Sequence, residues 1–265
     1  MINYLAASLL GLIEGITEYL PISSSGHLII AEHLLNIDGK IAEIFAVVIQ
    51  PGAILAALAL YWKRFWGLFF PPAIKGFYGL PGITLLCLTT FPACCAGLLI
   101  HSLLKGKLFS PYIVFSALIV GALCMLLTER IKKPPVTMTL DKLNMRQAIG
   151  IGLFQCMALW PGFSRSAATI MGGLLLGLSR EVAVTYSFIA AVPIMFAASG
   201  YEIIKYHHIF SSENAPFFLA GFICAFFSSL LVIKLFIALL SRIDLTPFAI
   251  YRLFLAPVFY FLIIK

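Results

Sequence analysis

Residues 14–27 place two carboxylates, three consecutive serine hydroxyls and an imidazole in a chain that is otherwise apolar enough for lipid. The acids are Glu14 and Glu18, and the segment ends at His27. An ionisable side chain at membrane depth costs about 3 kcal/mol or more, so such residues are functional-site candidates by default. Any fold of this chain must therefore enclose these groups in protein or in a polar cavity.

A second segment repeats this pattern later in the chain. Residues 11–14 (Gly-Leu-Ile-Glu) align with residues 152–155 (Gly-Leu-Phe-Gln), and Pro21 aligns with Pro161 if one residue is gapped between the two matches. The similarity returns at Ser110-Pro111-Tyr112 against Thr246-Pro247-Phe248. This internal repeat predicts two homologous halves.

Composition identifies the class of protein. Hydrophobic residues are 62% of the chain, charged residues are 11%, and the mean hydropathy is +1.03, which together exclude an ordinary soluble domain. A chain of 265 residues has room for about six or seven spans of about 20 residues each. We expect one membrane domain over residues 1–265, with repeat one at 1–130, a linker at 131–145 and repeat two at 146–265.

Each half begins with a segment that is broken rather than continuous. Residues 22–35 are too few to span a bilayer, and Pro21 with the Ser-Ser-Ser-Gly at 23–26 breaks the helix and supplies N-cap residues. We predict a re-entrant helix-loop-helix at 1–36 and a second one formed by 146–162 and 165–178. Full spans are expected at 42–62, 82–101, 112–129, 182–204, 216–240 and 247–264.

The predicted fold class is an all-α polytopic membrane protein with two inverted-topology repeats. Each repeat would be a re-entrant helix-loop-helix plus three transmembrane helices, and an odd number of crossings turns the second half upside down. Basic residues favour one side, which the positive-inside rule assigns to the cytoplasm, so both termini are expected outside it. The richer side holds Lys63, Arg64, Lys75, Arg130, Lys132, Lys133, Lys142, Arg146, Arg180 and Arg242, and the other side holds Lys40, Lys105, Lys107, Lys205 and Lys265.

The remaining charges and the cysteines suggest no further ligand. The net charge of +7 arises at the ends of apolar segments, so nucleic-acid binding is not expected. Lys234 and Arg252 lie near span ends, where we expect both to snorkel to the interface. The six cysteines lie within apolar runs without metal-ligand spacing, which indicates small buried hydrophobes.

Inverted halves would bring the two broken loops together near the middle of the membrane. Both loops precede a helix, and a helix N-terminus binds phosphate or carboxylate through its unpaired N–H groups and partial positive charge. Arg165 adds a planar fork suited to bidentate phosphate binding. The polar and small residues expected around such an anion are Ser23, Ser25, Gly162, Ser164, Ser166 and Thr169.

Glu14 and Glu18 share one helix face at i,i+4 spacing, so both can point at this site. They could hold a divalent cation such as Mg²⁺ or Ca²⁺, or one could act as a general base. Ser24 and His27 are the nucleophile candidates, and we favour Ser24 because Glu18 could take its proton. Direct attack by water is the third alternative.

Structural roles compete with this interpretation. Serines and glycines commonly mediate close helix packing, and His27 could be a structural hydrogen-bonding group. Arg165 could neutralise Glu14 or Glu18 in an ion pair. The acids, hydroxyls, imidazole and guanidinium all fall in the two repeated loops, and this coincidence favours a functional anion site.

At these residues the chain resembles the undecaprenyl pyrophosphate phosphatase family of bacterial inner membranes, the bacitracin-resistance proteins. The matching blocks are Glu14-Gly-x-x-Glu18-x-Leu-Pro-x-Ser-Ser-x-Gly-His27 and Leu159-Trp-Pro-Gly-Phe-Ser-Arg165-Ser-x-x-Thr169, with Phe248-Ala-Ile-Tyr-Arg252 near the end. The resemblance implies hydrolysis of a polyprenyl pyrophosphate lipid with a divalent cation, which regenerates the carrier for peptidoglycan synthesis. It also implies that Glu14, Glu18, Ser24, His27 and Arg165 are the functional residues.

The motifs also allow two other interpretations. Residues 24–27 resemble the central block of the type 2 phosphatidic acid phosphatases, but the two other blocks of that family are missing. An inverted-repeat transporter or flippase for an anionic or lipid phosphate substrate is the serious alternative. Two acids beside a phosphate would repel it unless a metal or a proton transfer is involved, which favours an enzyme. A homodimer is compatible with either function.

Overall fold

The computed structural model describes residues 4–37, 40–73, 76–103, 110–132, 134–205, 215–240 and 243–265. These residues form helices, and no β-strand occurs among them apart from an isolated bridge between Thr137 and Leu178. The all-α fold class is therefore confirmed.

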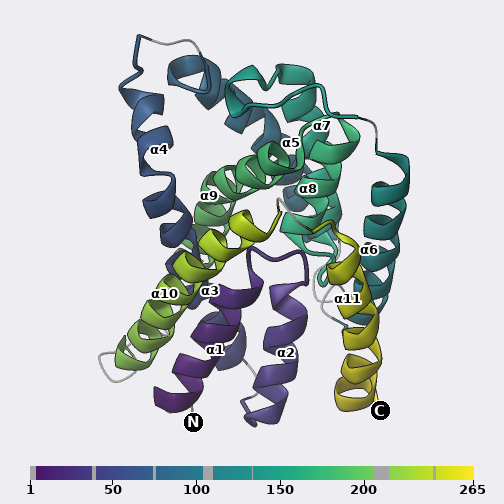
Figure 1. The fold of residues 1–265 in the computed structure, drawn as a ribbon. Helices are drawn as coiled ribbons and strands as arrows, with labels where there is room; N and C mark the ends of the chain where they lie inside the picture. Colours follow the sequence, from purple (N-terminus) through teal and green to yellow (C-terminus); the bar gives the residue numbers. More distant parts are fainter. Residues whose placement is uncertain are drawn as a thin grey trace.

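Two pairs of short helices lie at opposite ends of the molecule in Figure 1. Helices α1 (Tyr4–Thr17) and α2 (Ser24–Leu34) form the first hairpin. The second hairpin contains α7 (Met145–Gln155), a 3-10 turn (Cys156–Leu159) and α8 (Arg165–Leu175). None of these helices exceeds 14 residues, which is too short to cross a bilayer. The predicted breaks at both loops are confirmed.

Five described helices are long and apolar enough to cross a membrane, and a bent pair brings the number to six. The five are α5 (Gly79–Leu103), α6 (Pro111–Ile131), α9 (Arg180–Lys205), α10 (Ala215–Leu240) and α11 (Thr246–Phe259), which continues as a π-helical turn (Tyr260–Ile264). The bent pair is α3 (Lys40–Leu60) and α4 (Trp62–Phe69), which meet at 78°. These helices confirm a multi-pass membrane protein.

The predicted span at 42–62 misses the bend and the helix α4 that follows it. Trp62 and Trp66 lie one turn apart and their rings are 5.1 Å apart, while Lys63 and Arg64 stand between them in the sequence. An amphipathic segment of this kind forms a short helix of its own after the bend, where no helix was predicted between the spans at 42–62 and 82–101. The connection is accordingly shorter than predicted.

The helix after the second loop is more deeply buried than the helix after the first loop. Nine of the eleven residues of α8 are buried, against three of eleven in α2. The first hairpin packs on α10, where Ser229 Oγ donates a hydrogen bond to the Gly15 carbonyl at 3.1 Å. It also contacts α3, because Tyr19 donates its hydroxyl hydrogen to the Ala53 carbonyl at 2.9 Å. The first hairpin is thus held by spans from both halves of the chain.

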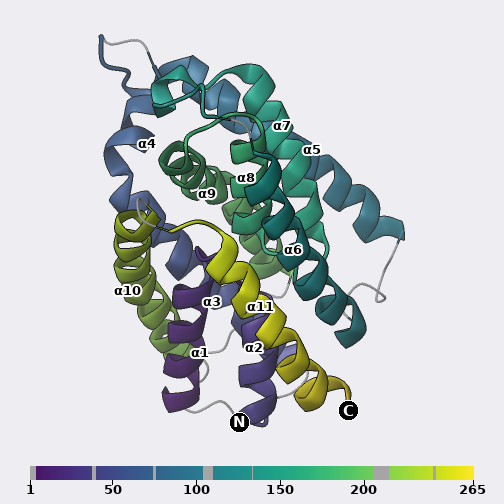
Figure 2. The same ribbon diagram turned by 45° about the vertical axis from the view of Figure 1, so that its right-hand side comes forward.

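Both ends of the described chain lie at one end of the molecule, as Figures 1 and 2 show. The connection from α6 to α7 lies at the other end, where Arg64 pairs with Asp141 at 2.7 Å. Both termini on one side agrees with the predicted topology, but the side of the membrane stays a prediction. Five of the basic residues used for that prediction lie outside the described residues: Lys75, Lys105, Lys107, Lys133 and Arg242.

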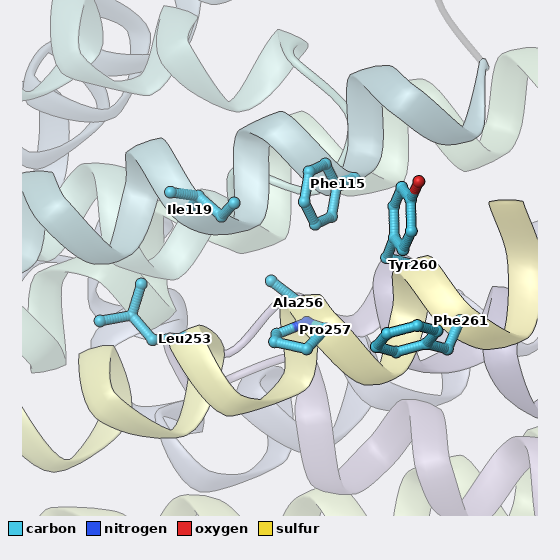
Figure 3. A pocket seen from close by; sticks show the side chains of 7 residues that line it. All are labelled: Phe115, Ile119, Leu253, Ala256, Pro257, Tyr260 and Phe261. Carbon is cyan, nitrogen blue, oxygen red and sulfur yellow. The ribbon is translucent and has the colours of Figure 1, made fainter. Parts of the chain in front are cut away.

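A cavity of about 330 Å³ lies between α6 and the end of α11 (Figure 3). Its lining is almost wholly apolar and comprises Phe115, Ile119, Leu253, Ala256, Pro257, Tyr260 and Phe261. Such a lining suits hydrocarbon and offers no charge to a phosphate. The cavity contains none of the side chains expected at the anion site.

Candidate active site

The helices after the two loops begin in the same unusual way. Ser23 precedes α2 with φ 74°, and its Oγ accepts the Gly26 N–H at 3.2 Å. Ser164 precedes α8 with φ 79°, and its Oγ accepts the Ala167 N–H at 3.3 Å. A positive φ in a residue with a side chain costs about 1–3 kcal/mol, so two such N-caps point to a local constraint shared by both loops.

These caps correct the alignment of the two repeats. Ser23 and Ser164 are equivalent, and the same spacing in the chain separates Glu14 from Gln155. No gap is needed, so the predicted pairing of Pro21 with Pro161 was wrong. The two loops match at their positive-φ N-cap serines, and the positions of the prolines did not reveal this match.

Glu18 lies at the centre of a hydrogen-bonded chain that joins the two loops. Its Oε2 accepts the Ser24 hydroxyl at 2.7 Å, and its Oε1 lies 3.3 Å from Arg165 Nη2. The side chain of Glu18 is 7% exposed. A serine, a carboxylate and a guanidinium are therefore in contact, as predicted.

Arg165 is already engaged by protein groups. Nη1 donates to the Ser187 carbonyl at 2.9 Å, and the guanidinium lies 5.8 Å from the centre of the Tyr19 ring. Its Nε is buried and has no partner among the described residues. The ion pair with Glu18, one of the structural alternatives, exists. The fork that we expected to be free for phosphate is thus partly occupied.

The hydroxyls of the second loop bond mainly within the protein. Ser166 Oγ donates to the Leu20 carbonyl at 2.9 Å and lies 3.0 Å from Ser164 Oγ. Thr169 Oγ1 donates to the Arg165 carbonyl at 2.9 Å and so accepts from Ser187 Oγ at 2.7 Å. These residues shape the loop and support Arg165.

Two further residues expected near the anion differ from each other in their surroundings. Gly162 is buried with φ 94°, and a Cβ there would come within 2.7 Å of the Val114 carbonyl oxygen. Ser25 is exposed and makes no hydrogen bond with a described side chain. Gly162 is therefore required by the backbone, whereas Ser25 does not join the network.

Glu14 is buried with both carboxylate oxygens unpartnered among the described residues. The residue is 1% exposed. Its equivalent Gln155 donates Nε2 to the Thr89 carbonyl at 3.1 Å. Because an uncompensated buried carboxylate is costly, Glu14 needs a proton or a cation.

The donor set at Glu14 and Glu18 fits a hard divalent cation only in part. No group of three or more His, Cys, Asp or Glu side chains that could hold a metal occurs among the described residues. Magnesium commonly takes one or two carboxylates and completes its shell with water and substrate phosphate oxygens. The Glu14 oxygens are free for such an ion, whereas both Glu18 oxygens already contact Ser24 and Arg165.

Hydrogen bonds define the tautomer of His27. Nδ1 lies 2.7 Å from the Ser23 carbonyl oxygen, which can only accept, so Nδ1 carries the proton. Nε2 lies 2.7 Å from the Tyr251 hydroxyl, which donates to it when the ring is neutral. Both ring nitrogens are therefore occupied.

Sequence reasoning missed Ser187, Tyr251 and Arg252. The prediction that Arg252 snorkels was wrong, because its side chain is 0% exposed and bonds to carbonyls inside the fold. Tyr251 and Arg252 do stand in a motif block quoted above, which was the available signal. Ser187 lies within an apolar span and gave none.

A sequence model described as bacitracin resistance protein BacA matches residues 7–258. The protein from Desulfovibrio desulfuricans is 56% identical over 264 residues, which cover 99% of this chain and 100% of that protein. The proteins from Maridesulfovibrio salexigens and Lawsonia intracellularis are 53% and 51% identical, over 98% and 95% of this chain and 99% and 95% of their own lengths. All three are named undecaprenyl-diphosphatase. The chain, with both loops inside the matched region, belongs to the bacitracin resistance protein BacA family.

Proposed function

We propose that this protein is an undecaprenyl-diphosphatase. It hydrolyses undecaprenyl pyrophosphate to undecaprenyl phosphate and inorganic phosphate, recycles the lipid carrier for peptidoglycan synthesis, and thereby confers bacitracin resistance. The observation that carries this proposal is the contact of the Ser24 hydroxyl with Glu18, whose other oxygen meets Arg165 from the second loop. The identity of the lipid substrate comes from the names of the relatives, which are undecaprenyl-diphosphatases.

The geometry supports a two-step transfer through Ser24. Ser24 Oγ attacks the terminal phosphorus, the bond from that phosphorus to the bridging oxygen breaks, and undecaprenyl phosphate leaves while Glu18 takes the serine proton. Water then attacks the phosphoserine, the bond between phosphorus and Oγ breaks, and inorganic phosphate is released as Ser24 regains a proton. A positioned base of this kind contributes about 10²- to 10⁴-fold in rate.

The hydrogen bonds favour Ser24 over His27 as the nucleophile. The Ser24 hydroxyl already donates to a carboxylate at 2.7 Å. His27 Nε2 is covered by the Tyr251 hydroxyl and would have to lose that bond before attacking phosphorus. His27 would instead orient the site, and it could protonate the leaving group only after gaining a proton at Nε2 in place of the bond to Tyr251. Attack by His27 or by water is the alternative.

The phosphates would bind between the two helix N-termini. The free N–H groups at the starts of α2 and α8 and the guanidinium of Arg165 supply positive charge to the substrate. Ser23 and Ser164 set the two caps, and Ser166 and Thr169 bond to main-chain carbonyls around the second loop. Binding would require Arg165 to share or exchange its bond to Glu18.

Glu14 and Glu18 would hold a divalent cation, Mg²⁺ or Ca²⁺. When bound, the ion would neutralise negative charge on the phosphate oxygens. The unpartnered oxygens of Glu14 support this role.

The transporter alternative has no specific observation in its favour. A reversible carrier needs no serine hydroxyl donating to a buried carboxylate, which is the contact seen at Ser24. Family membership and the names of the relatives also favour hydrolysis.

We also propose that both termini lie outside the cytoplasm, in the inner membrane of a bacterium, and that residues 1–130 and 146–265 are inverted repeats joined by 131–145. Single cysteines in a cysteine-free background test the orientation, with Lys142 expected inside and Lys105, outside the described residues, expected outside. Labelling of position 142 by an impermeant thiol reagent in intact cells would overturn it. Mass measurement of the detergent-solubilised protein tests a homodimer.

The activity is tested with detergent-purified protein and undecaprenyl pyrophosphate. We expect inorganic phosphate and undecaprenyl phosphate in equal amounts. Their release should require a divalent cation, so EDTA should abolish it. A Ser24→Ala preparation of equal purity is the control for contaminating phosphatases. Phosphate release that is the same in both preparations, or absent from both, would contradict the proposal.

A further inference from the structure

Two consecutive residues of α11 reach into the two different loops. Tyr251 bonds to His27 at the start of α2, and Arg252 bonds to the backbone just before Ser164. Helix α11 is otherwise packed on α6 at the edge of the fold (Figure 2). One turn of this helix therefore touches both halves of the candidate site.

Arg252 uses its whole guanidinium on main-chain carbonyls. Nη1 donates to the Phe163 carbonyl at 2.7 Å, and Nη2 donates to the Gly162 carbonyl at 2.9 Å. Nε and Nη2 also donate to two carbonyls of α6, those of Leu118 at 3.2 Å and Ala117 at 2.8 Å. The second loop is thus fastened to α6 through one side chain.

The Arg252 charge has no carboxylate partner within ion-pair distance among the described residues. Space for the buried head is made by Gly121, where a Cβ would lie 2.3 Å from Nη2. Burying a charge that meets only neutral acceptors costs desolvation free energy. An uncharged side chain would fill a purely structural role at a lower free-energy cost. This arrangement points to a task at the loop.

Peptide geometry shows what the bonds to the loop achieve. A trans peptide holds its C=O and the next N–H on opposite sides. Because the Phe163 carbonyl points at Arg252, the Ser164 N–H points away from it. Arg252 therefore withdraws carbonyl oxygens, which repel phosphate, from the opposite face of the loop.

Tyr251 acts on the other loop through its hydroxyl. The Tyr251 and His27 rings are nearly parallel at 1°, with centroids 5.6 Å apart, and the hydroxyl lies 2.7 Å from Nε2. The hydrogen bond keeps the ring in one orientation and one tautomer. Tyr251 is 43% exposed, so its hydroxyl is not needed to fill the core.

We propose that Tyr251 and Arg252 are positioning residues of the phosphatase site, in which Arg252 fixes the second loop and Tyr251 fixes the His27 imidazole. This inference rests on the proposed function for its kinetic consequences. Neither residue needs to touch the substrate to act in this way.

The first test compares Tyr251→Phe with Tyr260→Phe, a control in the π-helical turn that continues α11, whose hydroxyl makes no hydrogen bond among the described residues. Tyr251→Phe keeps the ring stack, so we expect kcat to fall about 5- to 10-fold, as for the loss of one hydrogen bond, with KM and Tm unchanged. Carbethoxylation of His27 by diethyl pyrocarbonate at pH 7, located by mass spectrometry, should become several-fold faster. Tyr260→Phe should change neither.

The second test compares Arg252→Lys with Arg180→Lys, since Arg180 also makes two bonds between elements but bonds to Glu129. Lysine keeps the charge and cannot span four carbonyls, so kcat should fall roughly 10-fold or more. Amide hydrogen exchange should accelerate in residues 160–167 and not in distant helices. Arg180→Lys should leave kcat and the exchange of that loop unchanged.

The inference is overturned if Tyr251→Phe and Arg252→Lys keep kcat within twofold of wild type while His27 carbethoxylation and loop exchange stay unchanged. It is also overturned if Arg252→Lys accelerates exchange equally throughout the protein, because that is a general loss of stability. The chemical and exchange measurements need no turnover. Lack of phosphate release by the wild-type protein would therefore contradict the proposed function and leave these two readouts to decide the positioning role.

Discussion

The two re-entrant hairpins share a backbone plan but differ in how their polar groups are satisfied. In the second hairpin, Gln155 Nε2 bonds to α5, and Ser166 and Thr169 bond to carbonyls, while Gln155 Oε1 and Arg165 Nε have no partner among the described residues. In the first hairpin, Glu14 is buried without a partner, and the Ser24 hydroxyl points at a carboxylate. Satisfied groups are rigid and unreactive, whereas unsatisfied groups are available for chemistry. We infer that the second hairpin serves as a scaffold that holds Arg165 and that the first hairpin is the reactive one.

Glu18 should give the largest effect, because it contacts both Ser24 and Arg165. We expect Glu18→Gln to lower kcat by roughly 10³-fold or more, since it removes the base and one end of the ion pair. The loss of kcat is measured as the rate of phosphate release from undecaprenyl pyrophosphate.

Glu14→Gln is the matched control for that prediction, because it restores at position 14 the amide found in the second hairpin at Gln155. Its loss of activity should be clearly smaller. Equal losses at both acids would contradict a separate role of Glu18 as the base and would leave cation binding as the role that the two acids share.

Arg165→Lys tests the contribution of the second hairpin. An ammonium keeps the charge but cannot bond to Ser187 and Glu18 and also present a fork to phosphate. We expect kcat/KM to fall by roughly 10²-fold with an unchanged elution profile in size-exclusion chromatography. Turnover near that of wild type would remove Arg165 from phosphate binding.

Exchanging Glu14 and Gln155 tests directly whether the two hairpins differ in the hydrogen bonding of their buried polar side chains. Gln155→Glu replaces the amide that donates to the Thr89 carbonyl by a carboxylate facing it, so we expect a loss of about 2 kcal/mol in stability. Glu14→Gln should leave the melting temperature in detergent unchanged or raise it. Equal destabilisation by the two changes would mean that the hairpins do not differ in this way.

Asp141, far from both loops, should affect stability only slightly and activity not at all. Burial raises its pKa, but the Phe77 N–H and Arg64 together lower it below its ordinary value. A depressed pKa gives stability that is complete above the unfolded value near about 3.9 and is lost as pH falls through the folded value.

Because the Arg64–Asp141 pair is about a third exposed, Asp141→Asn should cost under about 1 kcal/mol at pH 7 and abolish this pH dependence. Melting curves between pH 3 and pH 7 provide the measurement, with phosphate release as the control. A large loss of activity in Asp141→Asn would extend the functional region beyond the two loops.

Features that are local in sequence were predictable. Pro21 and the serines after it predicted the first loop, and the repeat predicted the second one at Ser164. The contact between Ser24 and Glu18 followed from their closeness in the chain and from the chemistry of the two groups. Periodicity and turn chemistry act over a few residues, which is why these expectations held.

Features that depend on packing between distant segments were not predictable. The 78° bend at α4 gives no proline or glycine signal at Tyr61, where it occurs. Arg252 was assigned to the interface because hydropathy reports depth along a span and not the direction in which a side chain points. Ser187 joins Arg165 only in the folded protein.

The assignment of chemistry to the first hairpin is tested most directly by trapping the covalent intermediate. Labelled undecaprenyl pyrophosphate is mixed with the enzyme, the reaction is quenched on the millisecond scale, and the phosphorylated residue is identified by mass spectrometry. We predict an acid-stable, base-labile phosphoserine at Ser24 that is absent from Glu18→Gln. An acid-labile adduct on His27, or a phosphoserine at Ser164 or Ser166 in the second hairpin, would contradict the assignment.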